Sequence, residues 1–178
     1  MAILNNEESL VPAVKGSIER RLGNLPMAVS LVVLVAVAVD QLTKHWVISH
    51  LNDGHVDHVV WTLQWNLSFN GGMAFGKGQG FGPVIGVIAT VVVVMLLLSL
   101  RQQGTARSNV AIGLIVGGAI GNIIDRLFRG EGFLQGKVID FIDFQWFPIF
   151  NVADMCVDIG GALLVLSYVL AKPKVDHV

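Results

Sequence analysis

The chain has 178 residues, of which 53% are apolar and a further 20 are glycine. Only 14% are charged, whereas about a quarter is usual in soluble domains. The apolar content excludes a disordered chain, the net charge of −1 without a basic region excludes a nucleic-acid-binding protein, and the single cysteine excludes a disulfide scaffold. The mean hydropathy of +0.67 is typical of a membrane protein.

Four long apolar stretches account for this composition. At 1.5 Å per residue, about 20 helical residues cross the roughly 30 Å hydrocarbon core of a bilayer. Spanning segments are helical because lipid offers no partner to unpaired backbone groups. Buried helices of a soluble protein are the alternative, but the second stretch has no polar face. We therefore predict an all-α integral membrane protein with spans at about 27–47, 81–100, 109–127 and 148–171.

Lysine and arginine residues between the spans predict the topology, because they favour the cytoplasmic side. Seven lie on the side of the two chain ends and five on the other side. We expect both termini in the cytoplasm, with a polar tail at 1–24, a transmembrane domain at 25–172 and a second tail at 173–178. The seven are Lys15, Arg20, Arg21, Arg101, Arg107, Lys172 and Lys174.

The first span has an alternative interpretation. Two arginines at 20–21, the apolar run and the small residues of 36–38 are also typical of a secretory signal with its cleavage site. The segment before the arginines would be unusually long for such a signal, and three spans would stay in the membrane in either case. We therefore favour a first span that is retained.

Polar residues collect at the outer ends of spans one, three and four. Ionisable side chains within spans are costly and usually mark function. Helices that alternate in direction would bring these ends into one layer. Asp40 and Lys44, four residues apart, can form a salt bridge on one helix face, which we interpret as a local anchor. The layer would contain Asp40, Gln41, Lys44, Asn122, Asp125, Arg126, Asp140, Asn151 and Asp154.

Helical spacing also predicts how the spans pack. Asn122 follows Gly118 by four residues on span three, and Asn151, Asp154 and Asp158 follow one another by three and four on span four. Each set would share one face. Small residues at every fourth position of span three permit close helix packing: Gly113, Gly117 and Gly121.

Two segments would lie outside the membrane on the same side as the polar layer. Residues 52–75 alternate between apolar and polar positions, which predicts a strand or hairpin. Its Trp61 and Trp65 suit the membrane interface, as do Trp146 and Phe147 in the second outer loop, 130–147.

The sequence narrows the chemistry that this layer can perform. No serine motif, phosphate-binding loop or dinucleotide fingerprint is present. Cys156 is interpreted as a core residue. The histidines of the first outer segment have no metal-ligand spacing and are interpreted as solvated or interfacial: His45, His50, His55 and His58. We therefore predict no metal and no cofactor.

Carboxylates remain as the reactive groups. Two aspartates close together in a poorly solvated site share one proton. The ionised one can then deprotonate water while the protonated one polarises a carbonyl, which is sufficient for peptide hydrolysis. Spacing alone does not choose among the candidates, which are Asp125, Asp140, Asp143, Asp154 and Asp158. It places Asp154 at the mouth of span four, and Asp140 in a loop that can fold back over it.

Five motifs, in order along the chain, resemble those of the bacterial lipoprotein signal peptidase family, signal peptidase II. The family motifs are D-Q-x-[ST]-K, N-x-G-x-A-F, G-G-x-x-G-N-x-x-D-R, V-x-D-F and F-N-x-A-D. Their counterparts here are DQLTK at 40–44, FNGGMAF at 69–75, GGAIGNIIDR at 117–126, VIDF at 138–141 and FNVAD at 150–154.

This resemblance implies a four-helix membrane aspartyl protease with a small extracytoplasmic β-cradle, acting near the outer face of the bacterial plasma membrane. Nothing in the sequence demands more than one copy of the chain, so we expect a monomer. The implied substrate is a prolipoprotein that carries diacylglycerol on a cysteine and is cut just before it. The motifs place the catalytic pair at Asp140 and Asp154. They imply substrate-binding groups at Asn70, Gly72, Asn122, Arg126 and Asn151, of which Asn122 and Asn151 would orient the pair, and structural groups at Asp40, Lys44 and Asp125.

The sequence departs from the family pattern at two places. Gly71 and Met73 stand where the turn after Asn70 usually has Thr and Ala, which could alter the loop but leaves the catalytic pair unaffected. The stretch from Asp140 to Asp154 is short, so we expect an abbreviated outer helix there.

Two other functions compete with the protease. Intramembrane carboxylates also mark the paths of ion- or proton-coupled transporters, but here they gather near one face, and no inverted repeat is apparent. A non-enzymatic assembly subunit could use the glycine repeat to pack on a partner. Neither alternative function explains why two aspartates should lie together beside several asparagines at the outer ends of the spans.

Overall fold

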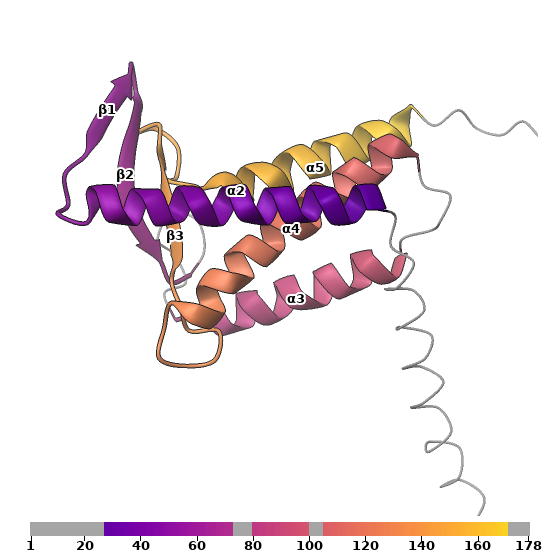
Figure 1. The fold of residues 1–178 in the computed structure, drawn as a ribbon, viewed down its shortest axis with the longest axis horizontal. Coiled ribbons are helices and arrows are strands. Elements are labelled where there is room, and N and C mark those ends of the chain that lie inside the picture. Colours follow the sequence, from indigo (N-terminus) through magenta and orange to yellow (C-terminus); the bar gives the residue numbers. More distant parts are fainter. Residues whose placement is uncertain (1–26, 73–79, 100–104, 171–178) are drawn as a thin grey trace, which may run out of the picture.

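The computed structural model describes residues 27–72, 80–99 and 105–170. Within these ranges the order is α2 (Met27–Leu51), β1 (Asp57–Val60), β2 (Leu63–Asn70), α3 (Gly82–Ser99), α4 (Ala106–Phe128), β3 (Val138–Asp143) and α5 (Val152–Val169). All four helices are long and apolar enough to cross a membrane. They lie side by side, with the strands at one end of the bundle (Figure 1). The predicted tails at 1–24 and 173–178 lie outside the described residues.

Several helix ends differ from the predicted spans, and capping explains two of the differences. α4 begins at Ala106 because Thr105 caps it, its hydroxyl accepting the Ser108 N–H at 3.1 Å. α5 begins at Val152, four residues after the predicted start at 148, because Asn151 has extended backbone and caps the helix. The C-terminal end of α2 lies at Leu51, beyond the predicted end at 47.

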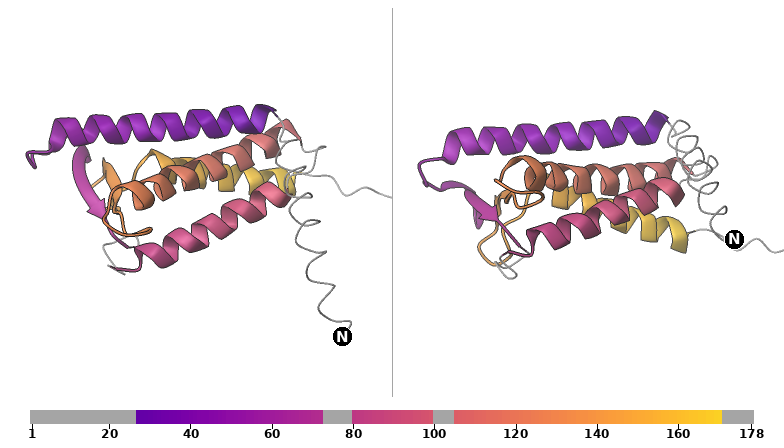
Figure 2. Two further views of the ribbon diagram at one scale, coloured as in Figure 1. Left: turned by 60° about the horizontal axis from the view of Figure 1, so that its bottom comes forward. Right: turned by 90° about the horizontal axis from the view of Figure 1, so that it is seen from below.

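α4 lies in the middle of the bundle. It packs against α2, α3 and α5, and Figure 2 shows it between its neighbours. The close approach requires glycine. A Cβ at Gly117 would lie 2.7 Å from the Cβ of Ala36 in α2, and a Cβ at Gly118 would collide with the carbonyl oxygen of Ala153 in α5. The predicted repeat of small residues therefore serves helix packing.

The outer faces of the helices are apolar. Ile88 and Met95 on α3 and Leu34 on α2 are exposed. Exposed apolar surface of this extent is unfavourable in water but suits contact with lipid. The arrangement confirms the predicted fold class, a transmembrane helical bundle with a small sheet.

The three strands form an antiparallel sheet in the order β1–β2–β3. β1 and β2 form the hairpin predicted within 52–75. β3 was not predicted, and the placement of Asp140 in a loop is wrong: Asp140 lies in β3 and pairs with Ser68 of β2. All six residues of β3 are buried, so the strand shows no alternation of apolar and polar residues that would reveal it.

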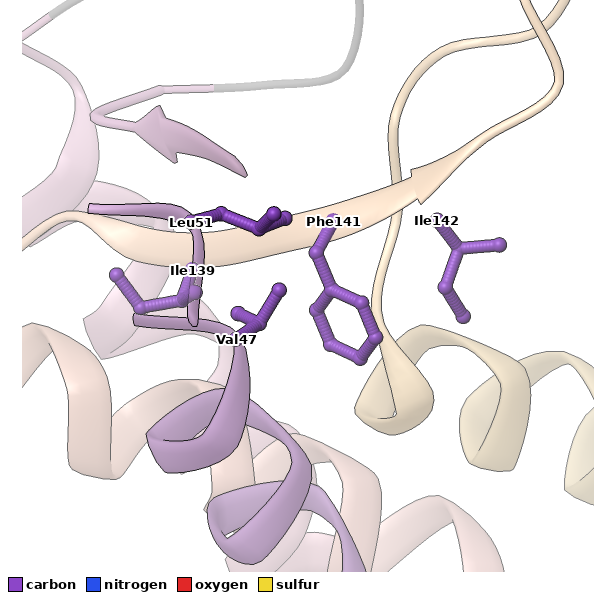
Figure 3. Close-up of a cluster of buried hydrophobic side chains, with 5 residues drawn as sticks. All are labelled: Val47, Leu51, Ile139, Phe141 and Ile142. Carbon is purple, nitrogen blue, oxygen red and sulfur yellow. The ribbon is translucent and has the colours of Figure 1, made fainter. Parts of the chain in front are cut away.

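A cluster of buried apolar side chains attaches β3 to the end of α2. Val47 and Leu51 of α2 pack with Ile139, Phe141 and Ile142 of β3 (Figure 3). Ile139 and Phe141 flank Asp140 in β3, and both pack in this cluster. Because successive side chains of a strand point to opposite faces, the side chain of Asp140 points to the other face of the strand from theirs.

Candidate active site

Asp140 is anchored by two asparagine amides. Its Oδ1 accepts a hydrogen bond from Asn151 Nδ2 at 2.6 Å and its Oδ2 accepts one from Asn70 Nδ2 at 3.0 Å. The residue is only 3% exposed. Burial, together with the nearby negative charge of Asp154, raises the pKa of Asp140 to about 6, although the two amides oppose the shift. Asp140 can therefore hold a proton at a pH where an ordinary aspartate is ionised.

Asp154 lies in the first turn of α5. Its Oδ1 accepts a hydrogen bond from Asn122 Nδ2 at 2.8 Å, and its Oδ2 accepts the backbone N–H of Asn151 at 3.2 Å. Asn122 is in turn oriented by Lys44, whose Nζ donates to the Asn122 Oδ1 at 2.9 Å. The cap of α5 and a side chain of α4 thus hold this carboxylate.

Asn151 links the two aspartates. Its side-chain amide donates to Asp140 at 2.6 Å, and its backbone N–H donates to Asp154 at 3.2 Å. The same amide also donates to Asn122 Oδ1 at 3.2 Å, and the Asn151 Oδ1 accepts the N–H of Asp154 at 3.0 Å. Asn151 is fully buried, so the carboxyl groups of Asp140 and Asp154 are both hydrogen-bonded to one well-packed residue.

Lys44 is the centre of a buried ion cluster. Its Nζ lies 2.9 Å from Asp40 Oδ2 and 2.7 Å from Asp125 Oδ2, and all three side chains are fully buried. The predicted salt bridge between Asp40 and Lys44 is present, but its interpretation as a local anchor is too narrow. Asp125 and Asn122 belong to α4, so the cluster joins two helices. Such a cluster is stable only while every charge has its partners.

The two carboxylates of this cluster also hold the backbone beside the predicted pair. Asp40 Oδ1 accepts the N–H of Ala153 at 2.9 Å, one residue before Asp154. Asp125 Oδ2 accepts the N–H of Ile139 at 3.2 Å, one residue before Asp140. Both residues therefore have structural roles that position their neighbours.

Arg126 lies at the edge of the site. The residue is 6% exposed, and its Nη2 donates to the carbonyl oxygen of Gly72 at 3.2 Å. Gly72 also donates its N–H to Asn70 Oδ1 at 3.0 Å. Among the residues that the structure describes, Nη1 of Arg126 has no hydrogen-bond partner, which leaves a donor for another group. Met73, which departs from the family pattern, lies outside the described residues.

A cavity of 540 Å³ opens beside Asp140, between the sheet and the segment before α5. Among the described residues, Asp140 lines it and Asp154 does not. Its walls are partly polar and partly aromatic, which suits a peptide with mixed side chains. The lining residues are Gln64, Ser68, Phe69, Asn70, Asp140, Asp143, Gln145, Phe147, Pro148 and Ile149.

Asp143, another candidate by spacing, has a different environment. Although burial raises its pKa, hydrogen bonds from Asn66 Nδ2 at 2.9 Å, Gln64 Nε2 at 2.7 Å and the Gln145 N–H at 2.6 Å outweigh this effect and lower it. Asp143 is thus an ionised group of the cavity wall. Gln64 and Asn66 are not among the predicted site residues, although their spacing of two on a predicted strand places both on one face.

The last candidate by spacing, Asp158, is exposed on α5. Within the described part of the chain, no hydrogen bond or ion pair joins it to Asp140 or Asp154. An unpredicted cluster lies elsewhere, where His50 and His55 meet Asp57. The structure therefore brings together Asp140 and Asp154 with the asparagines, and separates Asp158 from them.

Comparison with known proteins identifies the family of the chain. The sequence model of the Signal peptidase (SPase) II family matches residues 32–170. The chain is 35% identical to the lipoprotein signal peptidase of Bifidobacterium adolescentis over 156 residues, which cover 87% of this chain and 83% of that protein. It is 40% identical to the lipoprotein signal peptidase of Mycobacterium avium over 136 residues, which cover 76% and 74%.

Solved structures show the same fold. A bacterial membrane enzyme structure at 2.3 Å resolution superposes with a TM-score of 0.68 at 29% identity, covering 84% of this chain and 93% of that one. A second bacterial membrane enzyme structure, at 1.9 Å, gives a TM-score of 0.63 at 29% identity, covering 81% and 94%. With the family model matching most of its length, this chain belongs to the signal peptidase II family.

Proposed function

We propose that this protein cuts diacylglyceryl-modified prolipoproteins just before the lipid-modified cysteine, using Asp140 and Asp154 as an aspartic catalytic pair. As a member of the signal peptidase II family it is a multi-pass bacterial membrane protease that removes signal peptides from prolipoproteins. The observation that carries the aspartic mechanism is the contact of Asn151 with both carboxylates, at 2.6 and 3.2 Å.

The chemistry follows from one proton shared by the pair. Burial and the neighbouring carboxylate raise the pKa of Asp140 to about 6, which favours retention of one proton by the pair. The protonated carboxyl donates its proton to the carbonyl oxygen of the scissile peptide, and the ionised carboxyl takes a proton from a water molecule, whose oxygen attacks the carbonyl carbon. The tetrahedral intermediate then collapses: the C–N bond breaks, and the amine leaves with a proton returned by the pair. No covalent enzyme intermediate is required.

The groups around the pair would hold the substrate backbone. Asn70 lines the cavity beside Asp140, and the unpartnered Nη1 of Arg126 can donate to a substrate carbonyl near Gly72. The acyl chains on the substrate cysteine stay in the bilayer, each buried CH₂ contributing about 0.8 kcal/mol. They would fix the preceding peptide bond at the depth of the pair, at the end of the bundle that carries the sheet, which we place at the outer face.

The test is cleavage of a defined substrate by purified protein in detergent. A prolipoprotein bearing diacylglycerol on its cysteine is incubated with the wild-type chain, Asp140→Asn or Asp154→Asn, and the released signal peptide is identified by mass spectrometry. We expect loss of at least about 10³-fold in kcat/KM for either variant, because one carboxylate cannot both activate water and donate a proton.

The matched control is Asp158→Asn, which removes a carboxylate from the same helix without touching the pair. It should leave kcat/KM within about twofold of wild type. The wild-type enzyme should release a signal peptide that ends at the residue before the cysteine. Full turnover by either pair variant, with its helical circular dichroism intact, would falsify the aspartic mechanism.

A further inference from the structure

Two histidines and an aspartate gather where α2 ends and β1 begins. His50 lies in the last turn of α2, His55 in the connecting loop, and Asp57 is the first residue of β1. Gly54, with φ +84°, turns the loop back, and its N–H donates to the Leu51 carbonyl at 3.2 Å. One potential ligand atom from each of the three side chains lies within 4.8 Å of the other two.

The distance from each histidine to the nearer Asp57 oxygen is close to the ligand separation of a tetrahedral metal site. His50 Nε2 lies 2.9 Å from Asp57 Oδ2, and His55 Nε2 lies 3.4 Å from Asp57 Oδ1. Zinc binds imidazole nitrogen and carboxylate oxygen at about 2.0–2.2 Å, so two ligands of one tetrahedral ion lie about 3.3 Å apart. The present distances bracket this value, and small rotations of exposed side chains would suffice to admit an ion.

A fourth residue orients one ligand. Asp53 Oδ1 accepts hydrogen bonds from the His55 backbone N–H, at 3.1 Å, and from the His55 Nδ1. In the neutral ring the proton therefore lies on Nδ1, which leaves the lone pair of Nε2, 3.4 Å from Asp57 Oδ1, free to bind a metal ion. A carboxylate behind a histidine is the usual outer partner of a zinc ligand, because it fixes the tautomer and orients the ring.

The second histidine is oriented by packing. The His50 ring stacks on Trp46, one turn earlier in α2, with ring centroids 5.4 Å apart and planes at 19°. His50 and His55 rings also meet edge to face, with centroids 5.6 Å apart. The ligands are therefore held in place from two sides.

We propose that His50, His55 and Asp57 form a binding site for a divalent transition metal ion, with water as the fourth ligand. Two imidazoles and one carboxylate suit zinc, whereas calcium and magnesium prefer oxygen ligands alone. The site is distinct from the aspartate pair, and its bound ion would join β1 to the end of α2. The peptidase reaction proposed above uses no group of this site.

Cobalt(II) is the probe for the test, because tetrahedral coordination by imidazole gives it visible d–d absorption. The full-length protein, purified in detergent without a polyhistidine tag, is titrated with Co²⁺ and then with Zn²⁺. We expect one Co²⁺ per chain with tetrahedral bands, and displacement by Zn²⁺. Equilibrium dialysis with Zn²⁺ gives the stoichiometry independently.

Variants separate this site from general binding to surface histidines. His50→Ala and His55→Ala should each lose the bands, and Asp53→Asn should weaken affinity about tenfold. His45→Ala and His58→Ala, neighbours outside the cluster, should bind as wild type does. The proposal is overturned if wild type shows no tetrahedral bands, or if the two control variants weaken binding as much as His50→Ala does. Signal peptide release by each variant confirms that it is folded.

Discussion

At the scale of single residues, Asn151 makes two kinds of contact, one to the backbone of α5 and one to Asp140, and the sequence alone does not distinguish them. It caps α5 through the hydrogen bond from the Asp154 N–H to its Oδ1, and it orients Asp140 through its amide. A serine can perform the first function, because its hydroxyl is also a good cap. It cannot perform the second, because its side chain is too short to reach Asp140.

This difference gives a prediction with an internal control. Asn151→Ala should lower the free energy of unfolding by about 1 kcal/mol through loss of the cap, and Asn151→Ser should recover much of that loss. Both should lower kcat by at least about tenfold, because Asp140 loses its shortest hydrogen bond in each. Thermal unfolding and kinetics of signal peptide release measure the two effects. Equal kcat for the serine variant and wild type would contradict the orienting role.

The raised pKa of Asp140 predicts how stability depends on pH. Its pKa of about 6 in the folded chain exceeds the ordinary 3.8, so the folded state binds the proton more tightly than the unfolded state does. The contribution of protonated Asp140 to the free energy of unfolding is fully present below about pH 4 and is lost as pH rises through about 6. The size is on the order of 3 kcal/mol, at 1.36 kcal/mol per unit. The difference in Tm between Asp140→Asn and wild type should therefore grow in favour of the variant across this range; a constant difference would contradict the shift.

At the scale of elements, the positions of the proposed catalytic groups depend on how closely α4 packs against its neighbours. Gly118 of α4 faces the backbone of Ala153, the residue before Asp154. A larger residue there would move the start of α5. Gly161, on the same helix as Asp154, has no atom within 4 Å of where its Cβ would lie.

The two glycines therefore predict opposite outcomes for one substitution. Gly118→Ala should destabilise the bundle by about 1–3 kcal/mol through overpacking and should lower peptidase activity. Gly161→Ala should be neutral or stabilising, by up to about 1 kcal/mol, because alanine favours helix. Thermal unfolding in detergent compares them directly. Equal changes in stability for the two variants would show that the close contact of Gly118 with Ala153 does not govern the outcome.

Much of this element structure follows from the sequence. Length and hydropathy of the four spans predict the helices, and the alternation within 52–75 predicts the hairpin. β3 escapes prediction because its pairing with β2 is long-range and its residues are all buried. The contacts of Asp140 escape for the same reason. Asn70 lies 70 positions away along the chain, and only the family resemblance, not spacing, distinguished Asp140 from Asp143 in advance.

At the scale of the whole molecule, the sheet and the start of α5 lie at one end of the bundle, and the start of α2 and the end of α5 lie at the other (Figure 1). Asp140 belongs to β3 and Asp154 to the first turn of α5. We propose that the end with the chain termini lies in the cytoplasm, because lysine and arginine are in excess on that side. The proposed peptidase site would then face outward, where an exported prolipoprotein presents its cleavage site.

The single native cysteine allows this orientation to be tested. In a Cys156→Ala background, Val60→Cys places a thiol on the exposed hairpin, and Thr105→Cys places one before α4 at the opposite end. A membrane-impermeant thiol reagent should label the hairpin variant on intact protoplasts and the other variant only after lysis. The reverse pattern would invert the proposed topology.

The ion cluster around Lys44 has a consequence for the tolerance of the site to change. Asp40 holds the N–H beside one aspartate and Asp125 the N–H beside the other, and both lie within 3 Å of the same ammonium group. One cation thereby contacts both carboxylates that hold the two halves of the proposed reaction centre, which come from distant parts of the chain. Loss of its charge would misalign both halves at once, so substitutions at the two supporting carboxylates should not act independently.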